Sequence, residues 1–163
     1  MSSTPPVIVD EQDPSAEIIH KGVLIVDDNE QNLELLQAYL DELDGPVRLA
    51  IDGIQAIESV KNDPPDIILL DIMMPKMSGY QVCQLLKKDP ATKDIPIIMV
   101  TALSEVGDVE RAIDVGADDF LTKPVNKLEL LTRVRSLLRV RQLKRNLDDA
   151  VAEVRALRDQ SGD

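Results

Sequence analysis

The chain has 163 residues, 44% of them hydrophobic, which is enough for one domain with its own core and some additional length. Its formal net charge of -12 disfavours direct binding to nucleic acid. Residues 1–20 lack the pattern of a secretory signal, and no run approaches the ~20 apolar residues of a membrane-spanning helix. With a single cysteine, Cys83, an internal disulfide is excluded, and we expect a cytoplasmic protein without membrane insertion.

Residues 1–21 are rich in proline and acidic side chains without periodicity, so we expect a flexible acidic tail. From residue 22 onward, apolar runs of strand length alternate with helical patterns, which is typical of βαβ units around a parallel sheet. The predicted strands are Val23–Val26, Val47–Ala50, Ile67–Leu70, a strand from residue 96 or 97 to Thr101, and Asp119–Leu121.

Each predicted strand is followed by a helical pattern with one apolar face. The residues expected to point inward are Leu33, Leu36, Leu40 and Leu43, then Ile54, Ile57 and Val60, then Val82, Leu85 and Leu86, then Val106, Val109 and Ile113, and finally Leu130, Leu131, Val134, Leu137 and Leu138. Ser104 is the expected N-cap of the fourth helix, and Gly116 is expected to follow that helix. The pattern predicts a flavodoxin-like, doubly wound α/β domain, (βα)5, with strand order 2-1-3-4-5.

The apolar pattern changes after residue 138. Six residues there occupy the a and d positions of a heptad repeat: Val140, Leu143, Leu147, Ala150, Val154 and Leu157. Because this stripe is out of phase with the inward face of the fifth helix, we expect one long helix whose extension, residues 139–163, can form a short coiled coil. In a parallel pair Glu153 and Arg158 would attract, whereas Arg139 and Lys144 would repel. The repeat is shorter than three heptads, so a helix that folds back on its own domain or frays is the alternative.

Polar residues end four of the apolar runs. Asp27 and Asp28 follow the first strand, Asp71 the third, Thr101 ends the fourth, and Lys123 follows the fifth. Ligands of open parallel sheets bind outside the carboxyl ends of the strands, so we expect these side chains in one pocket. The carboxylates would repel a phosphoryl group unless a hard cation such as Mg²⁺ lay between them. Asp71, at the end of the central strand, is the best candidate for a nucleophile that forms an aspartyl-phosphate.

From Gly22 to Leu138 the chain resembles the receiver domain of two-component response regulators. The resemblance is carried by the segments LIVDDNEQNLELL, DIILLDIMMPKMSGYQVCQLLK, IIMVTAL and GADDFLTKPV. It implies that Asp71 is the phosphorylated aspartate and that Mg²⁺ is the cofactor. Asp28 is then a direct metal ligand and Asp27 holds a metal-bound water, while Asp71 and the backbone carbonyl of Met73 complete the set of protein ligands.

The same resemblance assigns roles at the ends of the last two strands. Thr101 corresponds to the switch hydroxyl, with Ala102 as the small residue beside it. Lys123 corresponds to the phosphate-binding lysine, and a cis peptide before Pro124 is expected to place it. Phe120 stands at the position of the switch aromatic, whose ring turns inward when the hydroxyl moves toward the phosphoryl group.

The resemblance therefore implies a signalling switch rather than an enzyme. A sensor histidine kinase would donate the phosphoryl group, and the signal would pass to a downstream effector protein or a fused output domain. The chain would be a stand-alone regulator or the receiver part of a longer protein. The segment KPVNKLELLTRVRSLLRVRQLKRNLDD is similar to receivers that lead into cyclase, phosphodiesterase or kinase domains. A homodimer would form through the fourth helix, fifth strand and fifth helix, or through the C-terminal helix.

Two other functions share parts of this pattern. A Mg²⁺-dependent phosphohydrolase also forms an aspartyl-phosphate, but it usually carries a second acidic residue two positions after the nucleophile, where this chain has Met73. A flavodoxin-type FMN carrier needs small or hydroxyl residues after the first strand to hold a phosphate. This chain has Asp28, Asn29 and Glu30 there, which disfavours that function.

Overall fold

A computed structural model describes residues 21–102 and 106–161. Five parallel strands form one sheet in the order β2-β1-β3-β4-β5, which confirms the predicted topology. The strands are β1 (Val23–Val26), β2 (Val47–Ala50), β3 (Ile67–Asp71), β4 (Ile97–Thr101) and β5 (Asp119–Thr122). The third and fifth strands each run one residue further than predicted.

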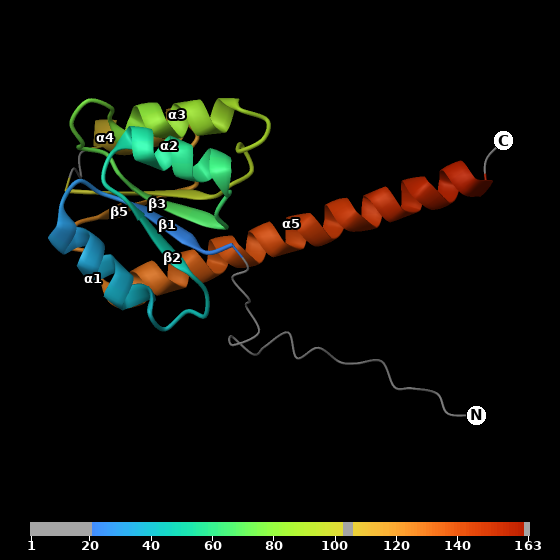
Figure 1. The fold of residues 1–163 in the computed structure, drawn as a ribbon, viewed down its shortest axis with the longest axis horizontal. Coiled ribbons are helices and arrows are strands. Elements are labelled where there is room, and N and C mark those ends of the chain that lie inside the picture. Colours follow the sequence, from blue (N-terminus) through green and yellow to red (C-terminus); the bar gives the residue numbers. More distant parts are fainter. Residues whose placement is uncertain (1–20, 103–105, 162–163) are drawn as a thin grey trace.

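Five helices alternate with the strands: α1 (Glu30–Leu40), α2 (Gly53–Asn62), α3 (Gly79–Lys88), α4 (Val106–Asp114) and α5 (Lys127–Ser161). Helices α1 and α5 cover one face of the sheet, and α2, α3 and α4 cover the other (Figure 1). The chain therefore has the doubly wound, flavodoxin-like fold that its sequence predicts, with a long C-terminal helix.

The sheet is buried on both faces, as the continuous apolar character of its central strands requires. Alternate residues of β1 point to opposite faces. Leu24 and Val26 belong to the core cluster under α2, α3 and α4. Val23 and Ile25 belong to the cluster under α1 and α5. The two clusters hold the sheet rigidly between the helix layers, so the carboxyl ends of the strands form a fixed platform.

Side-chain caps determine where the first three helices begin. Asn29 caps α1 by accepting from the N–H groups of two residues of its first turn, and Asp52 caps α2 in the same way with one N–H. Ser78 and Gln81 form a reciprocal capping box at the start of α3. The loop between β1 and α1 carries Asp27 and Asp28, and the loop before α3 directly follows Asp71. The caps of α1 and α3 therefore also determine the shape of the loops next to these carboxylates.

Several residues expected to point inward are exposed instead: Ile54 and Leu85 at 51%, Ile113 at 66% and Val106 at 75%. Small residues occupy the inward positions of two of these helices, since Ala56 of α2 is 0% and Ala112 of α4 is 1% exposed. An alanine lets a helix backbone approach the sheet closely, and the larger side chains one or two positions away then turn toward solvent. The predicted N-cap Ser104 lies outside the described residues, as does the predicted tail apart from Lys21.

Helix α5 is 35 residues long and projects beyond the sheet as one continuous element (Figure 1). The predicted single long helix is confirmed. The boundary of the domain at residue 138 stays a prediction, because the helix passes through it without a break. Among the described residues, no helix combines the length and the apolarity that crossing a membrane requires.

Candidate functional site

The candidate site lies at the carboxyl edge of the sheet. Asp27 and Asp28 directly follow β1, Asp71 is the last residue of β3, Thr101 is the last residue of β4, and Lys123 directly follows β5. The parallel register between neighbouring strands brings all four strand ends to this edge. Residues separated by up to 96 positions in the sequence thus meet here, as the sequence predicts.

Three carboxylates form the centre of the site. One oxygen from each of Asp27, Asp28 and Asp71 lies within 4.8 Å of the others. Asp27 is 2% and Asp71 5% exposed, whereas Asp28 is open to solvent. The Lys123 ammonium lies 2.9 Å from Asp27 Oδ2 and 3.5 Å from Asp71 Oδ1. One ammonium cannot balance three carboxylates, so the ionised cluster carries excess negative charge.

The excess charge is reflected in the protonation of Asp71. Burial raises the pKa of the Asp71 carboxyl from its ordinary 3.8 to about 6, and the neighbouring Asp27 carboxylate adds to the increase. The Lys123 ammonium acts in the opposite direction without cancelling it, and Asp28 makes a smaller contribution that raises the pKa. A cation bound among these carboxylates would favour the ionised form of Asp71, the form that can act as a nucleophile.

The loop after Asp71 packs tightly against that residue. A Cβ atom at Gly79 would lie 2.2 Å from the Asp71 carbonyl oxygen, so only glycine fits at the start of α3. The Gly79 N–H donates to the Ile72 carbonyl at 2.9 Å, which holds the loop closed. Lys76 within this loop has a φ of 69°, in the left-handed region. The Met73 side chain is 64% exposed, and the ligand atom predicted for this residue is its backbone carbonyl oxygen.

Two backbone contacts orient the charged groups. The Asn29 N–H donates to Asp27 Oδ1 at 2.9 Å, which leaves Asp27 Oδ2 for Lys123. The Lys123 N–H donates to the Thr101 carbonyl at 2.7 Å and ties the end of β4 to the lysine. The predicted cis peptide between Lys123 and Pro124 is present.

The three residues assigned to a switch belong to the last two strands of the sheet and the loop after β4. Thr101 is fully buried at the end of β4, and Ala102 follows it in an exposed position. Phe120 is half-buried and packs against the core cluster under α2, α3 and α4. Thr101 and Phe120 lie on the neighbouring strands β4 and β5, and Ala102 directly follows β4; the roles of the three residues in switching stay predictions.

Some residues that shape the site are not evident from the chemistry-bearing motifs. Asn29 and Gly79 act through backbone contacts, and their signals in the sequence were a cap position before a helix and a glycine after a proline-containing loop. Tyr80 connects α3 to α4: its hydroxyl donates to the Asp108 carbonyl at 3.2 Å, and the Arg111 guanidinium lies 4.3 Å from its ring centre. No spacing rule connects a tyrosine of one helix with an arginine of the next.

Comparison with known proteins agrees with this geometry. The family model of the response regulator receiver domain matches residues 23–135. The chain belongs to this receiver domain family. The receiver is 49% identical over 117 residues to response regulator PleD of Caulobacter vibrioides, a match that covers 72% of this chain and 26% of PleD. It is 44% identical over 117 residues to the DNA-binding dual master transcriptional regulator RpaA of Synechocystis sp., covering 72% of this chain and 48% of RpaA.

The receiver thus spans between about a quarter and about half the length of these curated relatives. A solved structure, the receiver domain of a signal transduction histidine kinase from Syntrophus aciditrophicus, is 36% identical with a TM-score of 0.68 and covers 74% of this chain and 90% of that chain. The receiver domain of sensor histidine kinase PA1611 from Pseudomonas aeruginosa is 32% identical with a TM-score of 0.67 and covers 73% and 98%. That structure holds a magnesium ion coordinated in its active-site cleft.

Proposed function

We propose that this receiver is a phosphorylation-dependent switch that accepts a phosphoryl group on Asp71 from a sensor histidine kinase, with Mg²⁺ as cofactor. One observation carries the proposal: a nearly buried carboxylate ends the central strand within 4.8 Å of two further carboxylates and 3.5 Å from an ammonium. This arrangement combines a nucleophile, a site for a hard cation and a positive charge for a phosphoryl oxygen.

The donor set fits Mg²⁺. Carboxylate oxygens are the ligands that this ion prefers, and Asp27, Asp28 and Asp71 leave negative charge that one ammonium does not balance. These three residues would hold the ion together with the backbone carbonyl of Met73. When bound, Mg²⁺ supplies the positive charge that lets an anionic phosphoryl group approach the carboxylates.

The ionised Asp71 carboxylate is the nucleophile of the transfer. One of its oxygens forms a bond to phosphorus while the bond between phosphorus and the donor's imidazole nitrogen breaks, and the imidazole leaves with that electron pair. Lys123 contacts Asp27 and Asp71, and its ammonium would turn toward a phosphoryl oxygen. The reaction is a single transfer between two side chains, as a switch requires.

We propose that the output starts at Thr101, whose hydroxyl would bind a phosphoryl oxygen. A charge-assisted hydrogen bond contributes about 1.5–3 kcal/mol, which is comparable to the gap of a few kcal/mol between two conformations of a switch. Movement of Thr101 would open space for the half-buried Phe120 ring and repack the face formed by α4, β5 and α5. The Arg133 guanidinium, which donates to both Asp119 carboxylate oxygens at 2.9–3.0 Å, lies on this face.

The partners in this proposal are the donor kinase and either a downstream effector or an output domain fused to the receiver. The lengths of PleD and RpaA beyond the matched region favour the second arrangement. A second copy of the chain is a further candidate partner, through the face of α4, β5 and α5 or through the C-terminal helix. Cys83 is a free thiol in the core, compatible with the reducing cytoplasm we propose for this switch.

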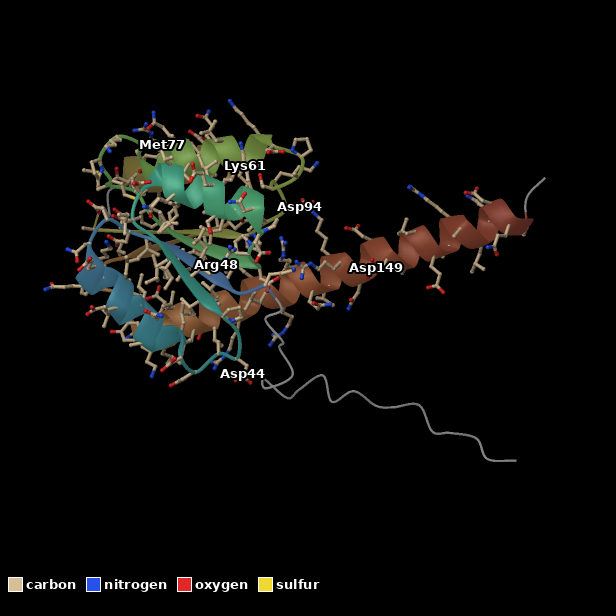
Figure 2. All side chains as sticks on the ribbon, viewed as in Figure 1. Asp44, Arg48, Lys61, Met77, Asp94 and Asp149 are labelled. Atoms are coloured by element: carbon tan, nitrogen blue, oxygen red, sulfur yellow. The ribbon has the colours of Figure 1, made fainter. Side chains whose placement is uncertain are left out.

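Intact-mass spectrometry after incubation with acetyl phosphate tests the proposal. We expect wild type to gain one phosphoryl group in the presence of Mg²⁺ and none in EDTA, with tandem mass spectrometry locating it on Asp71. Asp71→Asn keeps the shape of the side chain and removes the nucleophile, so it is expected to gain nothing. Asp149→Asn is the matched control, since Figure 2 shows this carboxylate on the part of α5 beyond the domain.

If Asp71→Asn gained as much phosphoryl group as wild type, or if wild type gained the same amount with Mg²⁺ and in EDTA, the assignment of Asp71 as the Mg²⁺-dependent acceptor would be refuted. Continuous release of phosphate from a small phosphate ester, in place of one transfer per chain, would favour the phosphohydrolase. The exposed Met73 side chain has no titratable group to protonate a leaving alkoxide, and we therefore expect no such turnover.

A further inference from the structure

An apolar seam is exposed along the extension of α5. Its a and d positions include Val140 and Leu157, each 58% exposed, and Leu143, Leu147 and Val154, each 62% exposed. The seam covers about 26 Å of helix at 1.5 Å per residue. It is uncovered in the single chain, so the alternative in which the helix folds back and buries these residues on its own domain is wrong.

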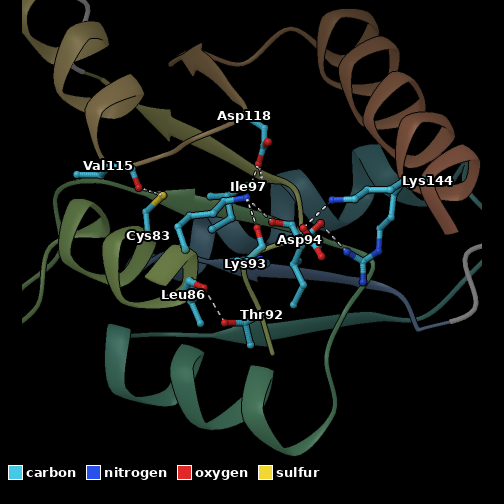
Figure 3. A network of polar contacts seen from close by, with 12 residues as sticks. Cys83, Leu86, Thr92, Lys93, Asp94, Ile97, Val115, Asp118 and Lys144 are labelled. Atoms are coloured by element: carbon cyan, nitrogen blue, oxygen red, sulfur yellow. Dashed lines mark hydrogen bonds and ion pairs between the residues drawn. The ribbon is translucent and has the colours of Figure 1, made fainter. Parts of the chain in front are cut away.

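Three basic side chains attach the first part of the extension to the domain. The Lys144 ammonium lies 2.7 Å from Asp94 Oδ1, and the Arg141 guanidinium donates to the Asp94 carbonyl at 2.8 Å. The Arg145 guanidinium lies 3.2 Å from Asp66 Oδ1. Figure 3 shows Lys144 reaching from α5 to Asp94 on the segment before β4. We call these five residues the acid clamp.

Asp66 is the buried member of the acid clamp, with a side chain only 5% exposed. Its second oxygen, Oδ2, accepts from the backbone N–H groups of Lys21 and Gly22 at 2.9 and 3.2 Å. The carboxylate is therefore held in place by the start of the domain before it pairs with Arg145. Together with the buried residues Leu130, Leu131 and Val134 of the same continuous helix, this pairing orients α5 about its own axis.

The two arginines of the acid clamp lie on the side of the helix away from the seam, whereas Lys144, at heptad position e, lies beside the seam. At about 100° per residue, Arg141 and Arg145 fall at heptad positions b and f, which point away from the a and d positions. The domain thus contacts the back of the extension, and the seam faces away from the domain. A second helix can therefore lie along the seam without meeting the receiver domain that carries the first helix.

The charges of the extension suit a second copy in the parallel orientation. Residues 139–161 carry six basic and four acidic side chains, a formal charge of +2, whereas the whole chain has a net charge of -12. Charge repulsion between two copies is therefore weaker along the extension than between the acidic remainders of the two chains. The predicted repulsion between Arg139 and Lys144 of two parallel helices is weakened, because Lys144 is paired with Asp94 of its own chain. Glu153 at g and Arg158 at the following e attract across a parallel pair and do not face each other in an antiparallel one.

We propose that the α5 extension is the interface of a parallel, two-stranded coiled coil between two copies of this chain, with its seam directed outward by the acid clamp. The inference goes beyond the phosphoryl switch and does not depend on it, because no residue of the seam or the clamp belongs to the carboxylate site.

Sedimentation equilibrium of the full chain tests the seam with two matched variants. Ala150 at position d and Ala152 at position f are both exposed in the single chain and stand two residues apart. Ala150→Glu places a charge in the seam and is expected to raise the dimer Kd at least about tenfold, whereas Ala152→Glu changes it by less than about twofold. A monomeric wild type at high micromolar concentration, or equal weakening by both variants, would overturn the proposal.

Asp71→Asn separates this result from the phosphoryl proposal. We expect it to dimerise as wild type does, even though it cannot be phosphorylated. A variant that loses dimerisation together with phosphorylation would show that dimerisation belongs to the switch and not to the seam.

Disulfide cross-linking tests the orientation. Leu143→Cys and Leu157→Cys stand near opposite ends of the seam, and in a parallel pair each meets its own copy, so both variants are expected to form covalent dimers on oxidation. Neither forms them in an antiparallel pair. Wild type, whose Cys83 is buried, and Ala152→Cys are the controls and are expected to stay uncross-linked.

The acid clamp is tested through its effect on Lys144. Asp94→Ala releases this ammonium toward the seam and is expected to weaken the dimer about twofold, as a like-charge pair does. The double variant Asp94→Ala, Lys144→Gln removes the released charge and is expected to restore the wild-type Kd. An unchanged Kd in the single variant would contradict the role of the clamp.

Discussion

Replacing Asp71 by asparagine is expected to stabilise the folded receiver at neutral pH in the absence of Mg²⁺. Asp71 has an ordinary pKa of 3.8 and a folded-state pKa of about 6, because the fold buries the carboxyl and places Asp27 beside it. The folded state therefore binds the Asp71 proton more tightly than the unfolded state does. It follows that the free energy of unfolding falls as pH rises from about 4 to about 6 and stays low above that range.

The size of the effect follows from the difference between the two pKa values, which corresponds to about 3 kcal/mol at most. Because Asp71 titrates together with Asp27 and Asp28, part of this free energy belongs to the whole cluster and stays when Asp71 alone is replaced. We therefore expect Asp71→Asn to be about 1–3 kcal/mol more stable than wild type near pH 7.5. The difference is expected to become small near pH 4, where the folded wild-type carboxyl keeps its proton and the unfolded one is only partly ionised. Urea denaturation of both proteins in EDTA at the two pH values measures it.

Adding Mg²⁺ tests the same reasoning. A cation that binds the folded carboxylate cluster stabilises wild type, so the difference in free energy of unfolding between Asp71→Asn and wild type becomes smaller. Asp149→Asn, on the exposed extension, is expected to leave stability unchanged at both pH values. The prediction is refuted if Asp71→Asn is no more stable than wild type near pH 7.5, or if its stability advantage over wild type is larger near pH 4 than near pH 7.5. Either result would mean that the surroundings of Asp71 do not destabilise its ionised form.

Two further substitutions test the packing around the site. Gly79→Ala places a Cβ 2.2 Å from the Asp71 carbonyl oxygen and is expected to cost about 1–3 kcal/mol in thermal or urea unfolding, whereas Gly107→Ala, which meets nothing within 4 Å, is expected to be neutral or stabilising. Equal effects of the two changes would contradict the close contact. Lys87→Met removes an ammonium that donates to two backbone carbonyls and pairs with a carboxylate, so we expect a loss of about 1–3 kcal/mol, against little change for the exposed Lys88→Met. A Lys87→Met protein as stable as its control would show that these contacts are not stabilising.

The strands could be predicted because burial on both faces leaves a direct trace in the sequence. Ile67–Asp71 and Ile97–Thr101 are continuous apolar runs that end in one polar residue, and all ten residues are buried. The helix faces were predicted less well. Ile54, Leu85 and Ile113 satisfy helical spacing as well as their neighbours do, and only packing against the sheet shows that small residues such as Ala112 occupy the inward positions instead.

The residues of the candidate site were predictable for a related reason. Each stands at the end of an apolar run, and parallel strands bring their carboxyl ends to one edge, so topology alone assembles Asp27, Asp71 and Lys123. The contacts that orient them were not predictable in the same way. The approach of Gly79 to the Asp71 carbonyl depends on the path of a loop, which no periodicity describes.

The order of the elements, the sheet topology and the identity of the charged residues were determined by the sequence itself, because they depend on local patterns and on a rule of connection shared by parallel sheets. Only the tertiary structure decided the protonation of Asp71 and the outward direction of the α5 seam. Both depend on distances between groups far apart in the chain: Lys123 and Asp27 are 96 positions apart, and Lys144 and Asp94 are 50 positions apart. Charge interactions and burial vary with such distances in space, and a linear pattern of residues does not contain them.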